Sequence, residues 1–208
     1  MKFKLFLFVL LFISIKSISQ TFLFDKQIEY KSDFNGNINL YLFNTKDNNY
    51  YFHASSFDNI KINGYLIDNK RNKIHSFEIV TIPNKIEFKY IETVEKKEGK
   101  NQTFTAYYFD KNEIMIDRNT TEITINAYNS KRMKKKNKTF TLTINVENED
   151  LILTEDFLDN FTHGAFSNSD YKFSFIIPSR ISIDNKNLNI ITSEMITNKK
   201  INLELIVK

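Results

Sequence analysis

The chain of 208 residues contains no cysteine, only two prolines and only four glycines. Without cysteine it can form no disulfide and can carry no lipid-modified cysteine, so hydrophobic burial and sheet hydrogen bonds must hold the fold together. Few prolines and glycines leave few of the usual turn residues. Asparagine is very common and tolerates the backbone conformations of turns, so we expect it to form many of them.

The N-terminal residues have the pattern of a secretion signal. Lys2 and Lys4 precede an apolar run at 5–15, and small residues follow at Ser17 and Ser19. The run is shorter than the ~20 residues that a membrane-spanning helix needs, which favours a cleaved signal over an uncleaved N-terminal anchor.

We therefore expect a signal peptide at 1–19 and a single β-rich domain at 20–208, within which 171–208 could form a C-terminal sub-unit. The residues around Ser19 and Gln20 resemble export signals of Gram-negative bacteria of the Bacteroidota type. The expected location is the periplasm or the outside of the cell.

The net charge gives no indication of a nucleic-acid partner. Removing Lys2, Lys4 and Lys16 with the signal lowers the 29 Lys and Arg residues to 26, against 25 Asp and Glu residues. A nucleic-acid-binding domain normally has a clear basic excess, so this class is excluded.

Alternation of apolar and polar residues indicates β-strands. The clearest case is 139–147, where Phe140, Leu142, Ile144 and Val146 alternate with polar residues. This period of two is typical of a strand with one buried and one solvated face. Further strands are predicted at 23–31, 37–43, 49–54, 58–62, 64–68, 73–80, 85–95, 102–110, 113–117, 121–127, 171–177, 180–184, 187–195 and 200–207.

The links between these strands are short, which favours antiparallel neighbours. Asn35-Gly36 and Asn63-Gly64 are predicted to form tight hairpin turns, and 68–72, 83–84 and 97–101 longer ones. We expect an all-β, mainly antiparallel fold: a curved sheet, half-barrel or barrel of roughly 10–12 strands.

One segment has a helical pattern. Thr154 can cap a short helix at 154–163, Phe157, Leu158 and Phe161 form an apolar stripe, and Gly164 can end it. The helix is expected to plug the sheet, or alternatively to act as a lid over a cavity.

Aromatic side chains are the candidate ligand contacts. The runs 50–52 and 107–109 could line a groove, although cross-strand packing explains them better. The apolar face that would hold a ligand is predicted to include Phe88, Tyr90, Phe104, Tyr108, Phe140, Phe157 and Phe161.

A basic run lies at 131–138. It could contact anionic headgroups of the envelope through Lys131, Arg132, Lys134, Lys135, Lys136 and Lys138. The favoured interpretation is a plain exposed hairpin tip, since the mature chain is nearly neutral.

Catalytic and metal-binding motifs are missing from the sequence. No G-x-S-x-G, Gly-rich phosphate loop or H-E-x-x-H occurs, and His53, His75 and His163 have no metal-ligand spacing. We predict no cofactor and no metal. His75 alternates with Phe77 and Ile79, which indicates a half-buried strand residue.

These observations favour a non-catalytic exported module that binds an apolar or lipid-like molecule or associates with the cell envelope. The alternatives are a secreted hydrolase with dispersed catalytic residues and an outer-membrane β-barrel.

Overall fold

The protein is described from a computed structural model. The structure describes residues 19–55, 62–82, 85–96, 108–128, 132, 136–145, 152–154, 157–158, 174–185 and 190–207. Apart from Ser19, the predicted signal peptide lies outside these residues.

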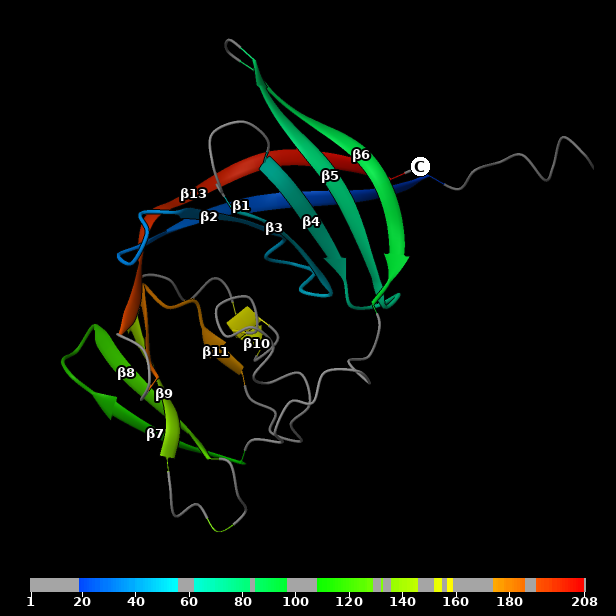
Figure 1. Ribbon diagram of the computed structural model, residues 1–208. Helices are drawn as coiled ribbons and strands as arrows, with labels where there is room; N and C mark the ends of the chain where they lie inside the picture. Colours follow the sequence, from blue (N-terminus) through cyan, green and yellow to red (C-terminus); the bar gives the residue numbers. More distant parts are fainter. Residues whose placement is uncertain are drawn as a thin grey trace, which may run out of the picture.

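Strands make up 79% of the described residues (Figure 1). Their bounds are β1 Gln20–Ser32, β2 Ile38–Phe43, β3 Tyr50–Ser55, β4 Ile62–Asp68, β5 Lys73–Ile82, β6 Lys85–Glu95, β7 Tyr108–Met115, β8 Thr120–Tyr128, β9 Lys136–Asn145, β10 Ile152–Thr154, β11 Ser174–Ile176, β12 Arg180–Asn185 and β13 Ile191–Val207.

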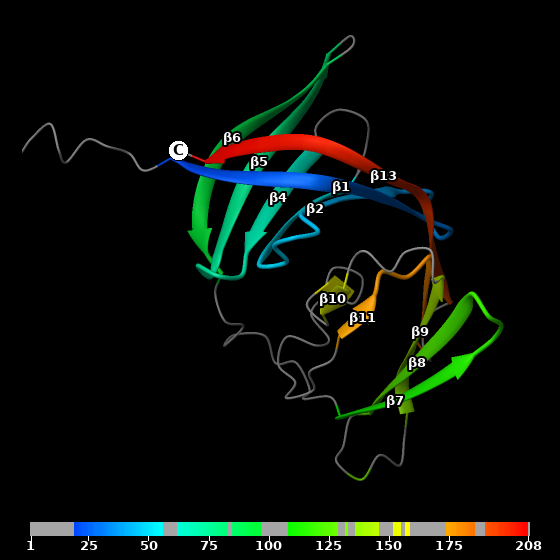
Figure 2. The ribbon, with the colours of Figure 1, turned by 180° about the vertical axis from the view of Figure 1, so that it is seen from behind.

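Eleven strands form one sheet in the order β6-β5-β4-β3-β2-β1-β13-β12-β9-β8-β7, and every pair in it is antiparallel. The sheet is curved but not closed. The all-β antiparallel prediction is therefore confirmed, in its open form. The short β10–β11 ribbon lies inside the curve (Figures 1 and 2).

Burial follows the alternation that the sequence predicts. In β9, Phe140, Leu142 and Ile144 are buried and the residues between them are not. Two of these residues face buried partners on β8, where Phe140 pairs with Ile125 and Leu142 with Ile123. The side chains of a cross-strand pair lie on the same face, so the two strands present one apolar surface.

The apolar residues form two separate clusters. The N-terminal core consists of Phe22, Phe24, Leu42, Phe52, Ala54, Leu66, Phe77, Ile79, Leu205 and Val207. The inner core, which includes the β10–β11 ribbon, consists of Ile28, Tyr30, Tyr41, Phe43, Tyr51, Phe109, Ile123, Ile125, Ala127, Phe140, Leu142, Ile144, Leu153, Phe157, Leu158, Phe175, Ile177 and Ile181.

Strands β2 and β3 separate the two cores. Tyr41 and Phe43 belong to the inner core, and Leu42 between them belongs to the N-terminal core. In β3, Tyr51 and Phe52 divide in the same way. Successive side chains of a strand point to opposite faces, so both faces of these strands are buried. The aromatic run 50–52 therefore contributes Tyr51 to the inner core and Phe52 to the N-terminal core, and neither of these two rings faces solvent.

The N-terminal core closes because β1 continues beyond β2. β1 pairs with β2 only from Lys26 to Lys31, and its earlier residues cross the neighbouring strands together with the end of β13 (Figures 1 and 2). The Phe22 ring centroid lies 5.1 Å from that of Tyr50 and 5.5 Å from that of His75. The first half of β1 therefore packs over β3 and β5.

The prediction of a turn at Asn63-Gly64 is wrong. Both residues lie inside β4, and Gly64 pairs with Ala54 on one side and Phe77 on the other. A Cβ atom on Gly64 would lie 2.1 Å from Cζ of Phe52. Glycine is present here because an aromatic ring packs directly on the strand backbone. In the sequence alone, such a glycine after an asparagine cannot be distinguished from a turn glycine.

The turns predicted at Asn35-Gly36 and at 68–72 do lie at connections between strands. Asn35 and Gly36 lie in the β1–β2 connection, where Gly36 has a φ of 68°. The segment 69–72 connects β4 to β5, with Asn72 at a φ of 55°. Residues 83–84 and 97–101 lie outside the described part of the chain.

The predicted strands 187–195 and 200–207 are one strand, β13, which spans Ile191–Val207. The polar residues between them are accommodated by two register shifts against β1, near Phe24 and near Glu29. Such bulges bend a long strand without ending it. β13 and β12 are central strands of the sheet, and β11 pairs with β10.

The predicted helix at 154–163 lies mostly outside the described residues. Thr154 ends β10, and Phe157 and Leu158 have helical backbone conformation and are buried in the inner core. Within the described residues no helix is long and apolar enough to cross a membrane.

Candidate functional site

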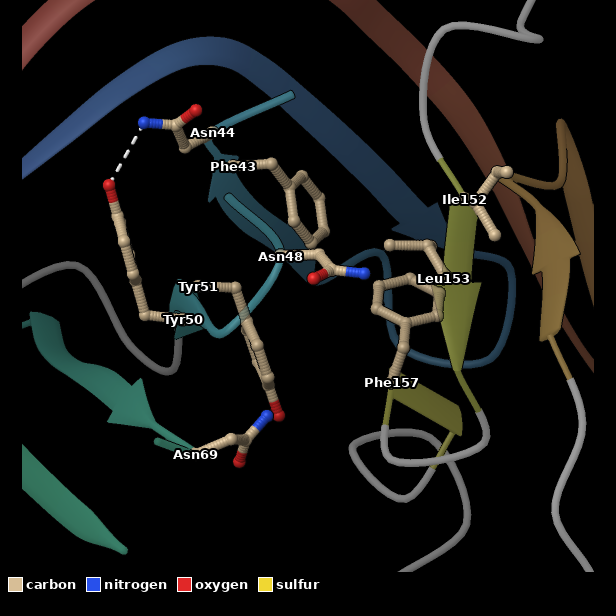
Figure 3. A pocket seen from close by; sticks show the side chains of 9 residues that line it. All are labelled: Phe43, Asn44, Asn48, Tyr50, Tyr51, Asn69, Ile152, Leu153 and Phe157. Atoms are coloured by element: carbon tan, nitrogen blue, oxygen red, sulfur yellow. Dashed lines mark hydrogen bonds between the residues drawn. The ribbon is translucent and has the colours of Figure 1, made fainter. Parts of the chain in front are cut away.

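A pocket opens between the β2–β3 turn and β10 (Figure 3). The end of β2, the turn and β3 provide one wall, and β10 and Phe157 provide the opposite one. We call it the asparagine pocket after its polar side chains. Its lining residues are Phe43, Asn44, Asn48, Tyr50, Tyr51, Asn69, Ile152, Leu153 and Phe157.

Hydrogen bonds hold the polar wall in place. The Asn44 amide nitrogen donates to the Tyr50 hydroxyl at 2.9 Å and to the Leu23 carbonyl at 3.1 Å. The Tyr50 hydroxyl donates to the same carbonyl at 2.9 Å. Strand β1 thus fixes the orientation of the β2–β3 turn.

The turn is also stabilised by its own side chains. The Asn44 amide oxygen accepts from the backbone N–H groups of Lys46 and Asp47 at 2.9 and 3.1 Å, which is an Asx turn. Thr45 donates its backbone N–H and its hydroxyl to Asp25, at 2.8 and 2.7 Å. Although burial opposes it, these bonds lower the pKa of the Asp25 carboxyl.

Asn48 is the exception among the pocket amides. Its side chain is exposed and makes no hydrogen bond with the described residues. In Figure 3 its amide points across the pocket toward Leu153 and Phe157. An amide has two donors and an acceptor, so Asn48 presents unused hydrogen-bonding capacity beside apolar side chains.

The space between the walls is small. Its cavity volume is about 30 Å³, enough for roughly two water molecules at ~10–15 Å³ each. Pockets that enclose a whole small molecule are about ten times larger or more. The asparagine pocket can therefore hold only the terminal group of a larger ligand.

Phe157 joins the pocket to the inner core. Its ring centroid lies 5.0 Å from that of Tyr41 and 6.0 Å from that of Phe43. It also lies 6.2 Å from Tyr30 and 6.4 Å from Phe175. Because the ring is 2% exposed, Phe157 is firmly packed in the inner core.

His53 lies on the same face of β3 as Tyr51. Its ring stacks on Tyr41 with the centroids 4.6 Å apart. The Nε2 atom is buried and has no hydrogen-bond partner. Burial lowers the pKa of His53 to about 4. At neutral pH the ring is neutral, and it does not line the asparagine pocket.

His75 lies on the face of Phe77 and Ile79, as its alternation predicts, but it is fully buried in the N-terminal core rather than half-buried. Its Nδ1 lies 2.7 Å from the Thr93 hydroxyl, which also bonds the Tyr90 hydroxyl at 2.8 Å. Burial lowers the pKa of His75, although the charge of Asp68 opposes this. His163 lies outside the described residues.

Asp68 is a buried carboxylate with a structural partner. It accepts from the Arg71 guanidinium at 2.9 Å and from the Arg71 backbone N–H at 3.1 Å. This pair closes the β4–β5 turn. Among the described residues no group of three or more His, Cys, Asp or Glu side chains could hold a metal ion.

The residues predicted to line a ligand face are divided between several places. Phe140 and Phe157 belong to the inner core, whereas Phe88 and Tyr90 pack on the N-terminal core. Tyr108 is 37% exposed on β7. Phe104 and Phe161 lie outside the described residues. Of the five described members of this set, only Phe157 lines the asparagine pocket.

The basic run 131–138 begins after the end of β8 and continues into β9, where Lys136 and Lys138 pair with β8 in a hairpin. Of its described members, Arg132 and Lys136 are exposed and Lys138 is partly buried. The hairpin placement that the sequence predicts is therefore confirmed.

The polar half of the asparagine pocket is not among the residues predicted from sequence. Asn44, Asn48 and Asn69 lie in turns, where asparagine is expected for backbone reasons alone. The available signal was the closeness of Asn44 and Asn48 to the aromatic run 50–52. Comparison of the chain with family models, curated proteins and solved structures finds no match.

Proposed function

We propose that the chain is an exported, non-catalytic binding module of the cell envelope, and that the asparagine pocket holds the polar end of an apolar or lipid-like ligand. The observation that carries this proposal is the unpartnered amide of Asn48, directed at Leu153 and Phe157 (Figure 3). An amide beside apolar walls suits an uncharged hydroxyl or carbonyl attached to a hydrocarbon body.

The rest of the lining supports the same ligand class. The nine described side chains are three asparagines, two tyrosines and four apolar residues, with no acid, lysine, arginine or histidine among them. The described lining therefore offers neither an ion to pair with a charged ligand nor a general base. Ile152, 56% exposed at the rim, offers apolar surface to the part of the ligand that stays outside.

Binding is tested with 1-lauroylglycerol, a neutral lipid with free hydroxyls, and with the laurate anion for comparison. In ¹H–¹⁵N NMR titrations of residues 20–208, the neutral lipid is expected to shift the Asn48 side-chain amide and the Leu153 backbone amide. Laurate is expected to bind more weakly, because no cation among the described lining residues compensates for its desolvation.

The matched variants are Asn48→Ala and Asn63→Ala, since Asn63 is an exposed asparagine outside the pocket. Losing the Asn48 hydrogen bonds is expected to raise the Kd about tenfold, or ~1.4 kcal/mol. Asn63→Ala is expected to leave the Kd unchanged. A titration without shifts at Asn48, or equal binding by both variants, would contradict the proposal.

Export is tested separately, by the mass and location of the chain in cells. The pattern at 1–19 predicts a processed chain that begins at Gln20, the first residue of β1. Recovery of the full-length chain from the cytoplasm would contradict export without affecting the binding test.

Envelope contact through the basic run is the remaining part of the proposal. The exposed Arg132 and Lys136 support attraction to anionic lipid, at about 1 kcal/mol for each charge near the surface. Co-sedimentation with phosphatidylglycerol vesicles is expected to fall for R132A/K136A and at high salt. Equal sedimentation with phosphatidylcholine vesicles would contradict it.

A further inference from the structure

The two edge strands of the large sheet, as the described residues define it, differ in regularity. At β6, the pairing with β5 is interrupted: Phe77 pairs with Tyr90 and Ser76 with Glu92, so Ile91 is an extra residue. β6 also lies against β13. A bulge twists an edge strand and discourages pairing with another chain. β7 at the opposite edge pairs with β8 in unbroken register.

Half of the backbone groups of β7 point away from β8. The Ile116 N–H donates to the Thr120 carbonyl at 2.9 Å, at the turn that joins β7 to β8. Because antiparallel pairs alternate, the even-numbered residues of β7 bond to β8 and the odd-numbered ones direct N–H and C=O outward. Lys111, Glu113 and Met115 thus supply outward-facing groups. Within the described residues, no strand pairs with this side of β7.

We propose that β7 pairs with β7 of a second copy of the chain, antiparallel about a two-fold axis at Asn112. When the strand is paired with a reversed copy of itself about Asn112, residues of opposite charge come to lie opposite each other. Lys111 then lies opposite Glu113 of the second copy, and Glu113 opposite its Lys111. Both are outward-facing residues, so each pair also exchanges two backbone hydrogen bonds.

Charge selects this register among its neighbours. An axis at Lys111 would place the two Lys111 side chains opposite each other, and an axis at Glu113 the two Glu113 side chains. Like charges directly opposite are destabilising in a sheet. Within one chain, Lys111 Nζ already lies 3.2 Å from a Glu113 carboxylate oxygen, so the dimer would hold four alternating charges.

Apolar residues flank these charges. Met115, 76% exposed, would lie opposite Phe109 of the second copy, whose ring is at the edge of the inner core. Ile116, 59% exposed, would lie opposite Tyr108, which is 37% exposed. The dimer therefore covers apolar surface that the single chain leaves in water.

Asp110 would lie opposite Ile114 of the second copy, and its charge is already satisfied. It accepts from the Asn126 amide nitrogen at 2.8 Å and from the Tyr128 hydroxyl at 2.7 Å. The latter bond, together with burial and the charge of Asp110, raises the pKa of the Tyr128 hydroxyl.

Charge reversal tests the pairing. Light scattering after size exclusion and sedimentation equilibrium, over about 1–200 μM, are expected to show a dimer for the wild type. Lys111→Glu and Glu113→Lys each place like charges opposite and are expected to raise the dimer Kd at least about tenfold. The double variant K111E/E113K restores opposite charges and is expected to dimerise like the wild type.

Mixing the two single variants provides an internal control. A Lys111→Glu chain has two acidic residues at the interface and a Glu113→Lys chain two basic ones, so an equimolar mixture is expected to form heterodimers. Both substitutions are at exposed positions of the edge strand, and unchanged circular dichroism would verify the monomer fold. A monomeric wild type at every concentration, or single variants that dimerise normally, would overturn the proposal.

Cross-linking tests the axis. The chain has no cysteine, so Asn112→Cys introduces a single thiol. At the two-fold axis, in a non-hydrogen-bonded pair, the two Cα atoms would lie about 4.5 Å apart, within disulfide range. Asn112→Cys is therefore expected to oxidise rapidly to a covalent dimer. Ile114→Cys, offset along the strand, is expected to remain reduced, and faster cross-linking at Ile114 would overturn the register.

Discussion

The N-terminal core and the inner core use the same kinds of side chain but assemble them differently. The N-terminal core is built mainly on β1–β6, in which each strand pairs with the next one in the sequence. The inner core joins β1–β3 to β7–β12 and fills the space with Leu153, Phe157 and Phe175. One core thus depends on local hairpins, and the other on contacts between distant parts of the chain.

Each core also holds a histidine whose Nε2 is buried without a hydrogen bond to the described residues. In the N-terminal core, Nδ1 of His75 has a hydroxyl partner in Thr93 and the ring lies near the charge of Asp68, but its Nε2 has no partner among the described residues. In the inner core, His53 stacks on Tyr41, and its Nε2 likewise has no partner among them. A buried polar atom without a partner destabilises a fold, and such atoms occur at binding sites more often than elsewhere.

Removing one large side chain from each core is expected to give the largest effect. Phe77→Ala and Phe140→Ala each delete a fully buried ring and are expected to lower the free energy of unfolding by about 3–5 kcal/mol. Because no residue belongs to both clusters, the two losses are expected to add in the double variant. Urea unfolding measures all three values. A deviation from additivity above ~0.5 kcal/mol would show that the cores are coupled.

Acid is expected to destabilise the inner core through His53. Its pKa is about 4 in the folded chain against 6.5 for the ordinary side chain, so between these values the unfolded chain binds more protons. Stability is therefore complete above pH 6.5 and falls by up to about 3 kcal/mol as the pH drops to 4.

His53→Phe keeps the aromatic stack on Tyr41 and removes the titrating group. The difference in unfolding free energy between wild type and His53→Phe is expected to shift in favour of the variant as the pH falls from 6.5 to 4. Parallel stability curves for the two proteins would show that His53 is not desolvated as described.

Glycine substitutions test the close packing of the N-terminal core. Gly64→Ala places a methyl group in the Phe52 ring and is expected to cost about 2–3 kcal/mol. Gly36→Ala meets no atom within 4 Å, so only its positive φ opposes it, at about 1 kcal/mol. Chemical denaturation of both variants gives the comparison. Equal costs would mean that the Phe52 ring moves aside freely.

The smallest expected effect concerns the link between β1 and the pocket. Tyr50→Phe removes the hydroxyl that bonds Leu23 and Asn44 and is expected to cost about 1 kcal/mol. Leu23 lies on the first half of β1. Tyr50→Phe is therefore expected to speed amide hydrogen exchange in this half of β1 more than in β8, relative to the wild type. Unchanged exchange at the β1 start would show that ring packing alone holds that strand.

Alternation was sufficient to predict most strands, because a two-residue period has a direct physical meaning in a half-buried sheet. It placed Phe140, Leu142 and Ile144 on one buried face, and His75 beside Phe77. It fails where contact with a distant strand or ring, rather than local spacing, determines which residue a position needs. Gly64 was mistaken for a turn residue because the Phe52 ring above it comes from β3.

The candidate site was less predictable than the fold. The apolar stripe predicts Phe157 as a ligand contact, and Phe157 lines the asparagine pocket. The sequence does not predict Asn48 and Asn69, because they lie 21 positions apart in two different turns that reach the same pocket only when β2–β5 pair. Phe88 and Phe140 were grouped as one face, yet they belong to different cores.

Local spacing in the sequence already specifies that the chain forms strands and which residues of each strand are buried together, and its lack of cysteine specifies that no disulfide stabilises them. The first two properties depend on neighbours within a few residues, where side-chain spacing alone decides burial. Three other features emerge only when the chain folds: β1 and β13 cross over the N-terminal strands, β2 and β3 are buried on both faces, and Asn48 lies near Leu153 and Phe157. Those outcomes depend on the pairing order and curvature of the sheet, which arise from contacts between distant residues.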